Sequence, residues 1–118
     1  MIIGGAYQGK AAYAKAQFPD VDWKFGGEIT EEELLGFQEY IRKALKAGED
    51  LTGLAEKLAQ QDPDVILVSE EVGYGIVPAD AFERQYREAV GRVCTALAAK
   101  SRRVTRVVCG IGTVLKDD

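Results

Sequence analysis

The chain of 118 residues has the length of one ordinary domain, which is enough for a single hydrophobic core. Hydrophobic residues make up 47% of it and charged residues 29%, as in a typical globular protein. The formal net charge of -4 argues against non-specific binding to nucleic acid or to an anionic membrane, since both need a basic surface.

The residue types present limit the reactions that this protein can catalyse and indicate its cellular location. The chain has no histidine, so imidazole cannot serve here as a base, a nucleophile or a metal ligand. Cys94 and Cys109 fall in different expected elements without a C-x-x-C spacing, and we interpret them as buried free thiols. No apolar run reaches the roughly 20 residues of a membrane span. The start lacks the basic region and the long apolar stretch of a secretory signal, so we expect a cytoplasmic protein.

A short strand and a helix are expected at the start of the chain. The apolar run Met1–Ile3 indicates a short buried strand, and the alanine-rich segment Lys10–Gln17 indicates the helix that follows a glycine-rich turn. Residues 21–25, VDWKF, alternate apolar and polar side chains, which predicts a second short strand. Gly26 and Gly27 end it.

One long helix is expected over residues 30–48, where the helix signals are strongest. Thr30 and Glu33 form a capping box, and acidic residues fill the first turn. Gly48 supplies the C-terminal stop. The expected apolar face consists of Leu34, Ile41 and Leu45.

The second half continues the alternation of helices and strands. Asp50 is expected to cap a shorter helix with a stripe of leucines, and the continuous apolar run Val65–Val68 indicates a strand covered on both faces. A long amphipathic helix is expected over Ala79–Lys100, and residues 104–112 indicate a last strand that ends in glycines. The side chains expected to face the sheet from the long helix are Phe82, Tyr86, Ala89, Val93 and Leu97. This order predicts a single α/β domain over residues 1–118 with a mostly parallel sheet.

The glycine-rich turn near the start is the first candidate site. Gly4, Gly9 and Lys10 match the phosphate-binding pattern G-x-x-x-x-G-K-[ST], but Ala11 stands where the pattern has a hydroxyl. In such a loop, backbone amides and the helix N-terminus bind a phosphate, and the lysine reaches its outer oxygens. A purely structural glycine turn is the alternative.

Acidic residues after the strand expected at residues 65–68 form the second candidate. Carboxylates just past a buried parallel strand lie where ligands bind in open α/β sheets. Glu70 or Glu71 would hold a hydrated Mg²⁺ beside the glycine loop, or both are solvated turn residues.

Arginines and aromatic residues leave two interpretations each. Arg84, Arg87 and Arg92 either grip a phosphate or carboxylate, or make surface salt bridges with neighbours such as Glu83 and Glu88. The aromatic side chains either stack on a base or pack in the core, and those considered are Tyr7, Trp23 and Phe25.

The two ends of the chain resemble a known family. The stretch EVGYGIVP from Glu71 to Pro78, the Arg84 and Tyr86-Arg87 pattern of the following helix, and GGAYQGK at residues 4–10 carry the resemblance, together with Gly91, Ala98 and Gly110. The family is the bifunctional adenosylcobinamide kinase / adenosylcobinamide-phosphate guanylyltransferase, which phosphorylates adenosylcobinamide and then attaches GMP in cobalamin synthesis.

The resemblance implies a small P-loop-type three-layer α/β domain that binds ATP or GTP, with Mg²⁺ as an accompanying ion and a corrinoid as second substrate. It also implies a homo-oligomer, a dimer or a trimer. Lys10 and Glu71 are the expected catalytic residues, and Glu70 and Glu71 the expected metal ligands. The expected nucleotide contacts are Gly4, Gly5, Ala6, Tyr7, Gln8, Gly9, Lys10, Ala11 and Arg87.

The chain also departs from the family pattern. The middle region, residues 21–62, is short and mostly helical where the family has further strands and the histidine that is guanylylated. Ala11 replaces a serine, Glu70 an asparagine, and Cys94-Thr95 an Asn-Gln pair. Two hypotheses follow: a reduced kinase that still moves a γ-phosphoryl group without guanylyl transfer, or a non-catalytic module that keeps the fold and an anion pocket.

Overall fold

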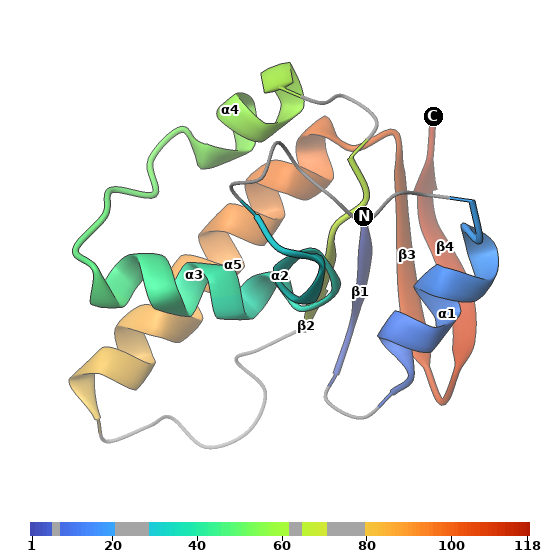
Figure 1. The fold of residues 1–118 in the computed structure, drawn as a ribbon, viewed down its shortest axis with the longest axis horizontal. Coiled ribbons are helices and arrows are strands. Elements are labelled where there is room, and N and C mark those ends of the chain that lie inside the picture. Colours follow the sequence, from blue (N-terminus) through green and yellow to red (C-terminus); the bar gives the residue numbers. More distant parts are fainter. Residues whose placement is uncertain (6–7, 21–28, 62–64, 71–79) are drawn as a thin grey trace.

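The computed structural model describes residues 1–5, 8–20, 29–61, 65–70 and 80–118, and Figure 1 shows its fold. No helix of this described part is long and apolar enough to cross a membrane. The strand that we expect over residues 21–25 lies outside it. Along the chain the elements are β1 (Ile2–Gly4), α1 (Lys10–Gln17), α2 (Glu31–Leu35), α3 (Phe37–Lys46), α4 (Leu54–Gln61), β2 (Val68–Glu70), α5 (Ala81–Lys100), β3 (Arg103–Val108) and β4 (Ile111–Asp117).

The four strands form one mostly parallel sheet in the order β2-β1-β3-β4, which confirms the predicted α/β class. The first strand, β1, lies between β2 and β3 and runs parallel to both, and β4 pairs antiparallel with β3 at the edge. The strand that we expect over Val65–Val68 begins later in the structure. The apolar run leads into β2, which spans Val68–Glu70.

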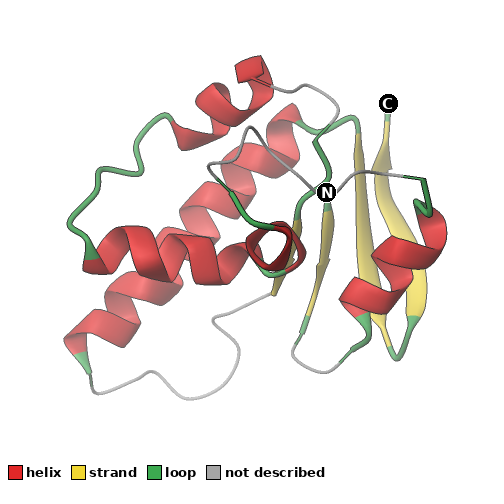
Figure 2. Cartoon of the chain, in the orientation of Figure 1, coloured by secondary structure: helices red, strands yellow, loops and turns green. Residues whose placement is uncertain are grey.

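Helices cover both faces of this sheet, so the domain has three layers (Figure 2). Ile2, Val68 and Val107 point to one face, where they pack with Ala14 of α1. Leu67, the neighbour of Val68, points to the other face and joins the larger core. This alternation follows from the two-residue period of a strand, which sends successive side chains to opposite faces.

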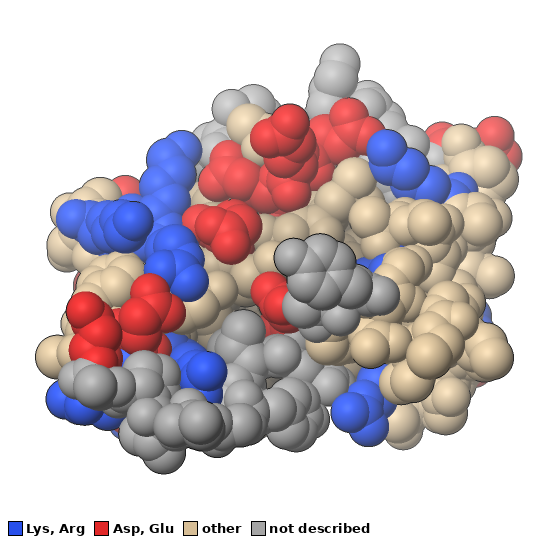
Figure 3. Space-filling model, turned by 90° about the horizontal axis from the view of Figure 1, so that it is seen from below, with Lys and Arg blue, Asp and Glu red and all other residues tan. Residues whose placement is uncertain are grey.

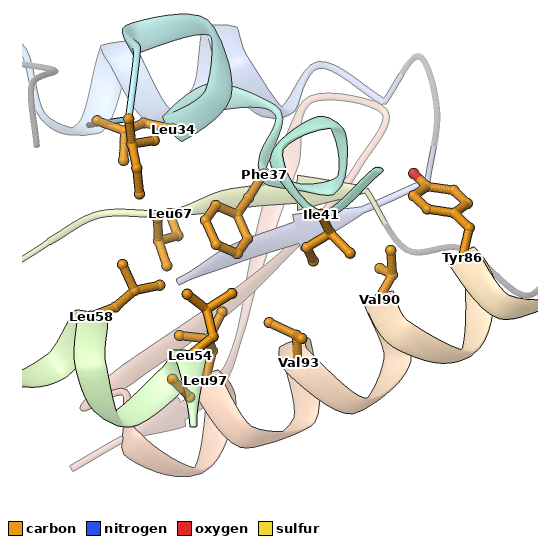
Figure 4. Close-up of a cluster of buried hydrophobic side chains, with 12 residues drawn as sticks. Leu34, Phe37, Ile41, Leu54, Leu58, Leu67, Tyr86, Val90, Val93 and Leu97 are labelled. Atoms are coloured by element: carbon orange, nitrogen blue, oxygen red, sulfur yellow. The ribbon is translucent and has the colours of Figure 1, made fainter. Parts of the chain in front are cut away.

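The larger core is built mainly between helices (Figure 4). Phe37 and Ile41 of α3 and Leu58 of α4 meet the buried face of α5 there. The buried residues of that face are Tyr86, Val90, Val93 and Leu97. We expected the face of α5 to lie on the sheet, but it packs chiefly on α3 and α4, because α3 lies between it and β2 on this side.

The helix expected over residues 30–48 is divided into α2 and α3 at Gly36. Its predicted ends are confirmed. The Thr30 hydroxyl accepts from the Glu33 backbone at 3.1 Å, which gives the capping box, and Gly48 takes a positive φ of 74° after α3. The glycine at the break lacks helix propensity, which explains the division.

Asp50 does not begin the next helix. Its carboxylate accepts from the Thr52 backbone at 2.9 Å, which forms a turn, and α4 starts only at Leu54. Asp and Asn side chains stabilise such turns as readily as helix N-termini, so the sequence signal does not separate the two.

The expected last strand is a hairpin instead. Cys109 and Gly110 take positive φ angles of 51° and 76° and turn the chain back into β4, which the sequence interpretation missed. Two positive φ angles are the geometry of a two-residue hairpin turn. The thiol of Cys109 is exposed, not buried as we expected, whereas Cys94 is largely covered.

Candidate functional site

The candidate loop begins at Gly4, the last residue of β1. Only glycine fits at this position. A Cβ placed on Gly4 would lie 2.6 Å from the carbonyl oxygen of Val107 and 3.1 Å from two methylene carbons of Lys10. The strand can therefore turn into the loop while β3 stays close beside it.

The loop ends at Gly9, which caps α1 without a side chain. Gly9 has a φ of 83°, and its carbonyl accepts the first helical hydrogen bond, from the Tyr13 backbone at 2.9 Å. The first amide groups of any helix lack partners within the helix and carry partial positive charge. A strand, a glycine turn and a helix N-terminus therefore form an arrangement that fits a phosphate.

Lys10 adds a full positive charge to this loop. Its ammonium group donates to the carbonyl of Gly5 at 2.7 Å, so it lies across the loop and not in open solvent. Ala11, the next residue, is exposed and offers no oxygen to a metal ion. Ala6 and Tyr7, two expected nucleotide contacts, lie outside the described residues.

Glu70 lies beside the start of the loop. The parallel register pairs Gly4 of β1 with Glu70 of β2, so both residues end their strands at the same edge of the sheet. The Glu70 amide donates to Oε1 of Gln38 at 3.0 Å, which fixes this strand end against α3. Glu71, the second expected acid, is outside the described part of the chain, and within that part no three acidic or thiol groups gather as a metal site.

A polar cluster that sequence analysis missed lies next to β2. The guanidinium of Arg42 pairs with Glu83 at 2.6 Å and stacks over the ring of Tyr86, 4.0 Å from its centre. The hydrogen bond to Glu83 raises the pKa of Arg42, and burial raises the pKa of Tyr86. No local sequence pattern indicates this pair, because Arg42 and Glu83 lie 41 positions apart on two helices.

The carboxyl edge of the parallel strands is seen in Figure 3. Acidic and basic side chains gather over the helical half, and the half formed by α1, β3 and β4 is mostly uncharged. Lys10 brings a positive charge to the loop itself through its hydrogen bond to Gly5.

The arginines expected on α5 differ in their surroundings. Arg92 pairs with Glu88, as expected for a surface salt bridge, but Glu83 pairs with Arg42 of α3 and not with a residue of its own helix. Arg87 is half-buried in the second turn of α5. Trp23 and Phe25, weighed as stacking residues, fall outside the described residues.

Two hollows of the described surface lie away from the loop. One of about 420 Å³ lies between the connection of α3 to α4 and helix α5, next to Leu51 and Ala89. The other, of about 410 Å³, includes Met1 and Asp117 at the opposite edge of the sheet. Neither of these two hollows includes a described residue of the candidate loop.

A buried parallel strand, a glycine turn and a helix that begins with lysine define an α/β protein of the phosphate-loop type. The sequence pattern of the family "Cobinamide kinase / cobinamide phosphate guanyltransferase" matches residues 29–115. This chain therefore belongs to that family, which confirms the resemblance found from its motifs.

Three relatives show how far the similarity extends. The bifunctional adenosylcobalamin biosynthesis protein CobU of Escherichia coli (strain K12) is 48% identical over 52 residues, 44% of this chain and 29% of the relative, and the CobU of Salmonella typhimurium (strain LT2) gives the same values. CobP of Pseudomonas aeruginosa, with the same descriptive name, is 37% identical over 65 residues, 55% of this chain and 38% of the relative. The match thus spans well under two thirds of each relative's length.

Proposed function

We propose that this chain binds ATP or GTP through the loop between β1 and α1. In this proposal it takes part in cobalamin biosynthesis, with a corrinoid as its second substrate. The observation that carries the proposal is the position of Lys10, whose ammonium lies 2.7 Å from the Gly5 carbonyl and faces the same loop as the helix N-terminus. Membership of the family and the names of the relatives support the substrate class.

Each group has a distinct role in the proposed phosphoryl transfer. The loop amides and Lys10 orient the phosphates and stabilise the charge that develops during transfer, which is the main contribution a protein makes to this reaction. Glu70, which lies beside Gly4 in the sheet register, and Glu71 are proposed to hold a hydrated Mg²⁺. The ion, when bound, would neutralise phosphate charge. Arg87 is proposed as a further phosphate contact.

Guanylyl transfer is not part of the proposal. The resemblance implies a bond between GMP and a histidine, and the chain has no histidine to form it. Incubation with GTP labelled in its α-phosphate is expected to leave no acid-labile label on the protein. Stoichiometric labelling would show another nucleophile and refute this part.

The second candidate is a nucleotide-binding module without catalysis, and Ala11 favours it. Its methyl group replaces the hydroxyl that normally donates an oxygen to Mg²⁺, so binding through amides and Lys10 survives while metal placement weakens. Transfer of labelled γ-phosphate from ATP to adenosylcobinamide in a single turnover separates the two candidates: product supports the kinase, and binding without product supports the module.

Calorimetry tests the shared claim of both candidates. ATP, GTP and adenosylcobinamide are titrated into the protein with and without Mg²⁺, and Lys10→Ala is compared with Lys15→Ala. Lys15 lies on the same helix but pairs with Glu31 at 3.4 Å away from the loop, so it is the matched control. Lys10→Ala is expected to weaken nucleotide binding at least about tenfold, because it removes a charge-assisted contact. Equal affinities for both variants, or no binding at millimolar nucleotide, would refute the site.

A further inference from the structure

Gln8, in the described part of the candidate loop, accepts two hydrogen bonds from the turn between β3 and β4. Gln8 accepts the backbone N–H of Cys109 with its side-chain Oε1 at 2.7 Å. Its backbone carbonyl accepts the N–H of Gly110 at 2.8 Å. Residues about 100 positions apart in the chain are thus joined by two short hydrogen bonds.

Close packing extends this contact on both sides of Gln8. A Cβ on Gly9 would lie 3.5 Å from the Cα of Gly110, so a side chain added there would touch the backbone of the turn. One helical turn further on, the Tyr13 hydroxyl lies so close to Gly112 that a Cβ there would be 2.2 Å from it. The hairpin therefore supports the end of the loop and the first turn of α1 together.

We infer that Gln8 is a positioning residue, which ties the loop to the β3–β4 turn and so holds the loop amides in the arrangement that binds phosphate. The inference rests on the proposed function, since it assigns a role within the same site. Its physical basis is entropy: a glycine-rich loop has many conformations, and binding to a loop that is already ordered avoids the cost of ordering it. The side chain of Gln8 acts on the turn, while its backbone stays part of the loop.

The coupling between the loop and the turn must be reciprocal. If the turn favours the binding conformation of the loop, then a phosphate ligand must favour the contact with the turn by the same factor. Binding at the loop is therefore expected to slow hydrogen exchange of the Cys109 and Gly110 amides, although both are exposed residues at a hairpin end.

Gln8→Met tests the inference, because methionine keeps the length of the side chain and lacks a strong acceptor. Gln38→Met is the matched control: Gln38 also accepts a backbone N–H with Oε1, from Glu70 at 3.0 Å, but does not contact the turn. Pyrophosphate affinity is measured by calorimetry, and exchange of the Cys109 amide by NMR, in all three proteins. Gln8→Met is expected to bind pyrophosphate about three- to tenfold more weakly and to exchange the Cys109 amide faster, as loss of one hydrogen bond implies. The titrations contain no Mg²⁺, so the proposed metal ligand Glu70, whose amide Gln38 accepts, does not take part, and Gln38→Met is expected to change neither value.

The outcomes separate this inference from the proposed function. Unchanged affinity in Gln8→Met refutes the positioning role, whether or not the Cys109 amide exchanges faster. If the unmodified protein binds no pyrophosphate, the proposed function fails. The tie is then decided by exchange alone: faster Cys109 exchange in Gln8→Met and not in Gln38→Met supports it, and equal rates refute it.

Discussion

Gly4 offers the most direct test of how tightly the loop is built into the sheet. In Gly4→Ala the new Cβ would lie 2.6 Å from the Val107 carbonyl, about 0.8 Å short of the 3.4 Å at which ordinary contact begins. The obstacle is backbone of the neighbouring strand, which cannot rotate away as a side chain can. Overpacking of this kind costs about 1–3 kcal/mol. At about 4 °C per kcal/mol for a domain of this size, the midpoint of thermal unfolding should fall by about 4–12 °C.

Gly91→Ala is the matched control, because it makes the same chemical change in open space. Gly91 is exposed within α5, and a Cβ there meets nothing within 4 Å. Alanine is the better helix former by about 1 kcal/mol, so this variant should melt about 4 °C higher. The two variants are compared by thermal unfolding followed by circular dichroism.

Opposite shifts of the two glycine variants would support the reasoning, and a Gly4→Ala protein that melts within a degree of the unmodified one would refute it. The same variant also bears on the site. Two carbons of Lys10 lie 3.1 Å from the new Cβ, so the lysine must move, and pyrophosphate affinity should fall with stability. Unchanged affinity would mean that the loop adjusts without loss of function.

Four further predictions concern metal, stability, thiols and assembly. Ala11→Ser should strengthen ATP binding in calorimetry only when Mg²⁺ is present, because it restores one metal oxygen. Arg42→Met should lower the free energy of unfolding in urea by about 1–2 kcal/mol, from a partly screened ion pair with Glu83 and the contact with Tyr86. Burial raises the pKa of the Cys94 thiol above its ordinary 9.0. As the pH rises, this thiol therefore loses its proton at a lower pH in the unfolded chain than in the folded protein. Stability should therefore fall as the pH rises past 9, less so in Cys94→Ala, and thiol reagents should label exposed Cys109 before Cys94. Light scattering should show a dimer or trimer at micromolar concentration, since Val108, Ile111, Val114 and Leu115 are exposed on β3 and β4, and a clean monomer would refute this.

Local signals in the sequence predicted what depends on neighbouring residues. The bounds of α1, the capping box of Thr30 and the stop at Gly48 follow from side chains within a few positions of each other, and the structure confirms all three. The glycine loop belongs to the same group, because strand, turn and helix are contiguous.

Contacts between distant segments could not be predicted in this way. The tie from Gln8 to Cys109 and the pairing of Arg42 with Glu83 join residues 101 and 41 positions apart. The hairpin was missed because its turn begins with Cys109, which rarely takes a positive φ. The signal for the hairpin was the apolar residues that follow Gly110, because apolar runs on both sides of a glycine turn indicate two strands and not one.

Among the strands that the structure describes, β2 lies at one edge of the sheet, and helices from the middle of the chain pack beside it. An edge strand normally exposes unpaired backbone groups. Here α2 lies along that edge, with Leu34 packed into the larger core on one face and Leu35 into the smaller core on the other. Gln38 of α3 then accepts the Glu70 amide at the strand end. In the parallel register, Glu70 of β2 lies opposite Gly4 of β1. The glycine loop thus has β2 on one side and the β3–β4 turn on the other, and both neighbours contribute to the geometry on which the proposed anion site depends.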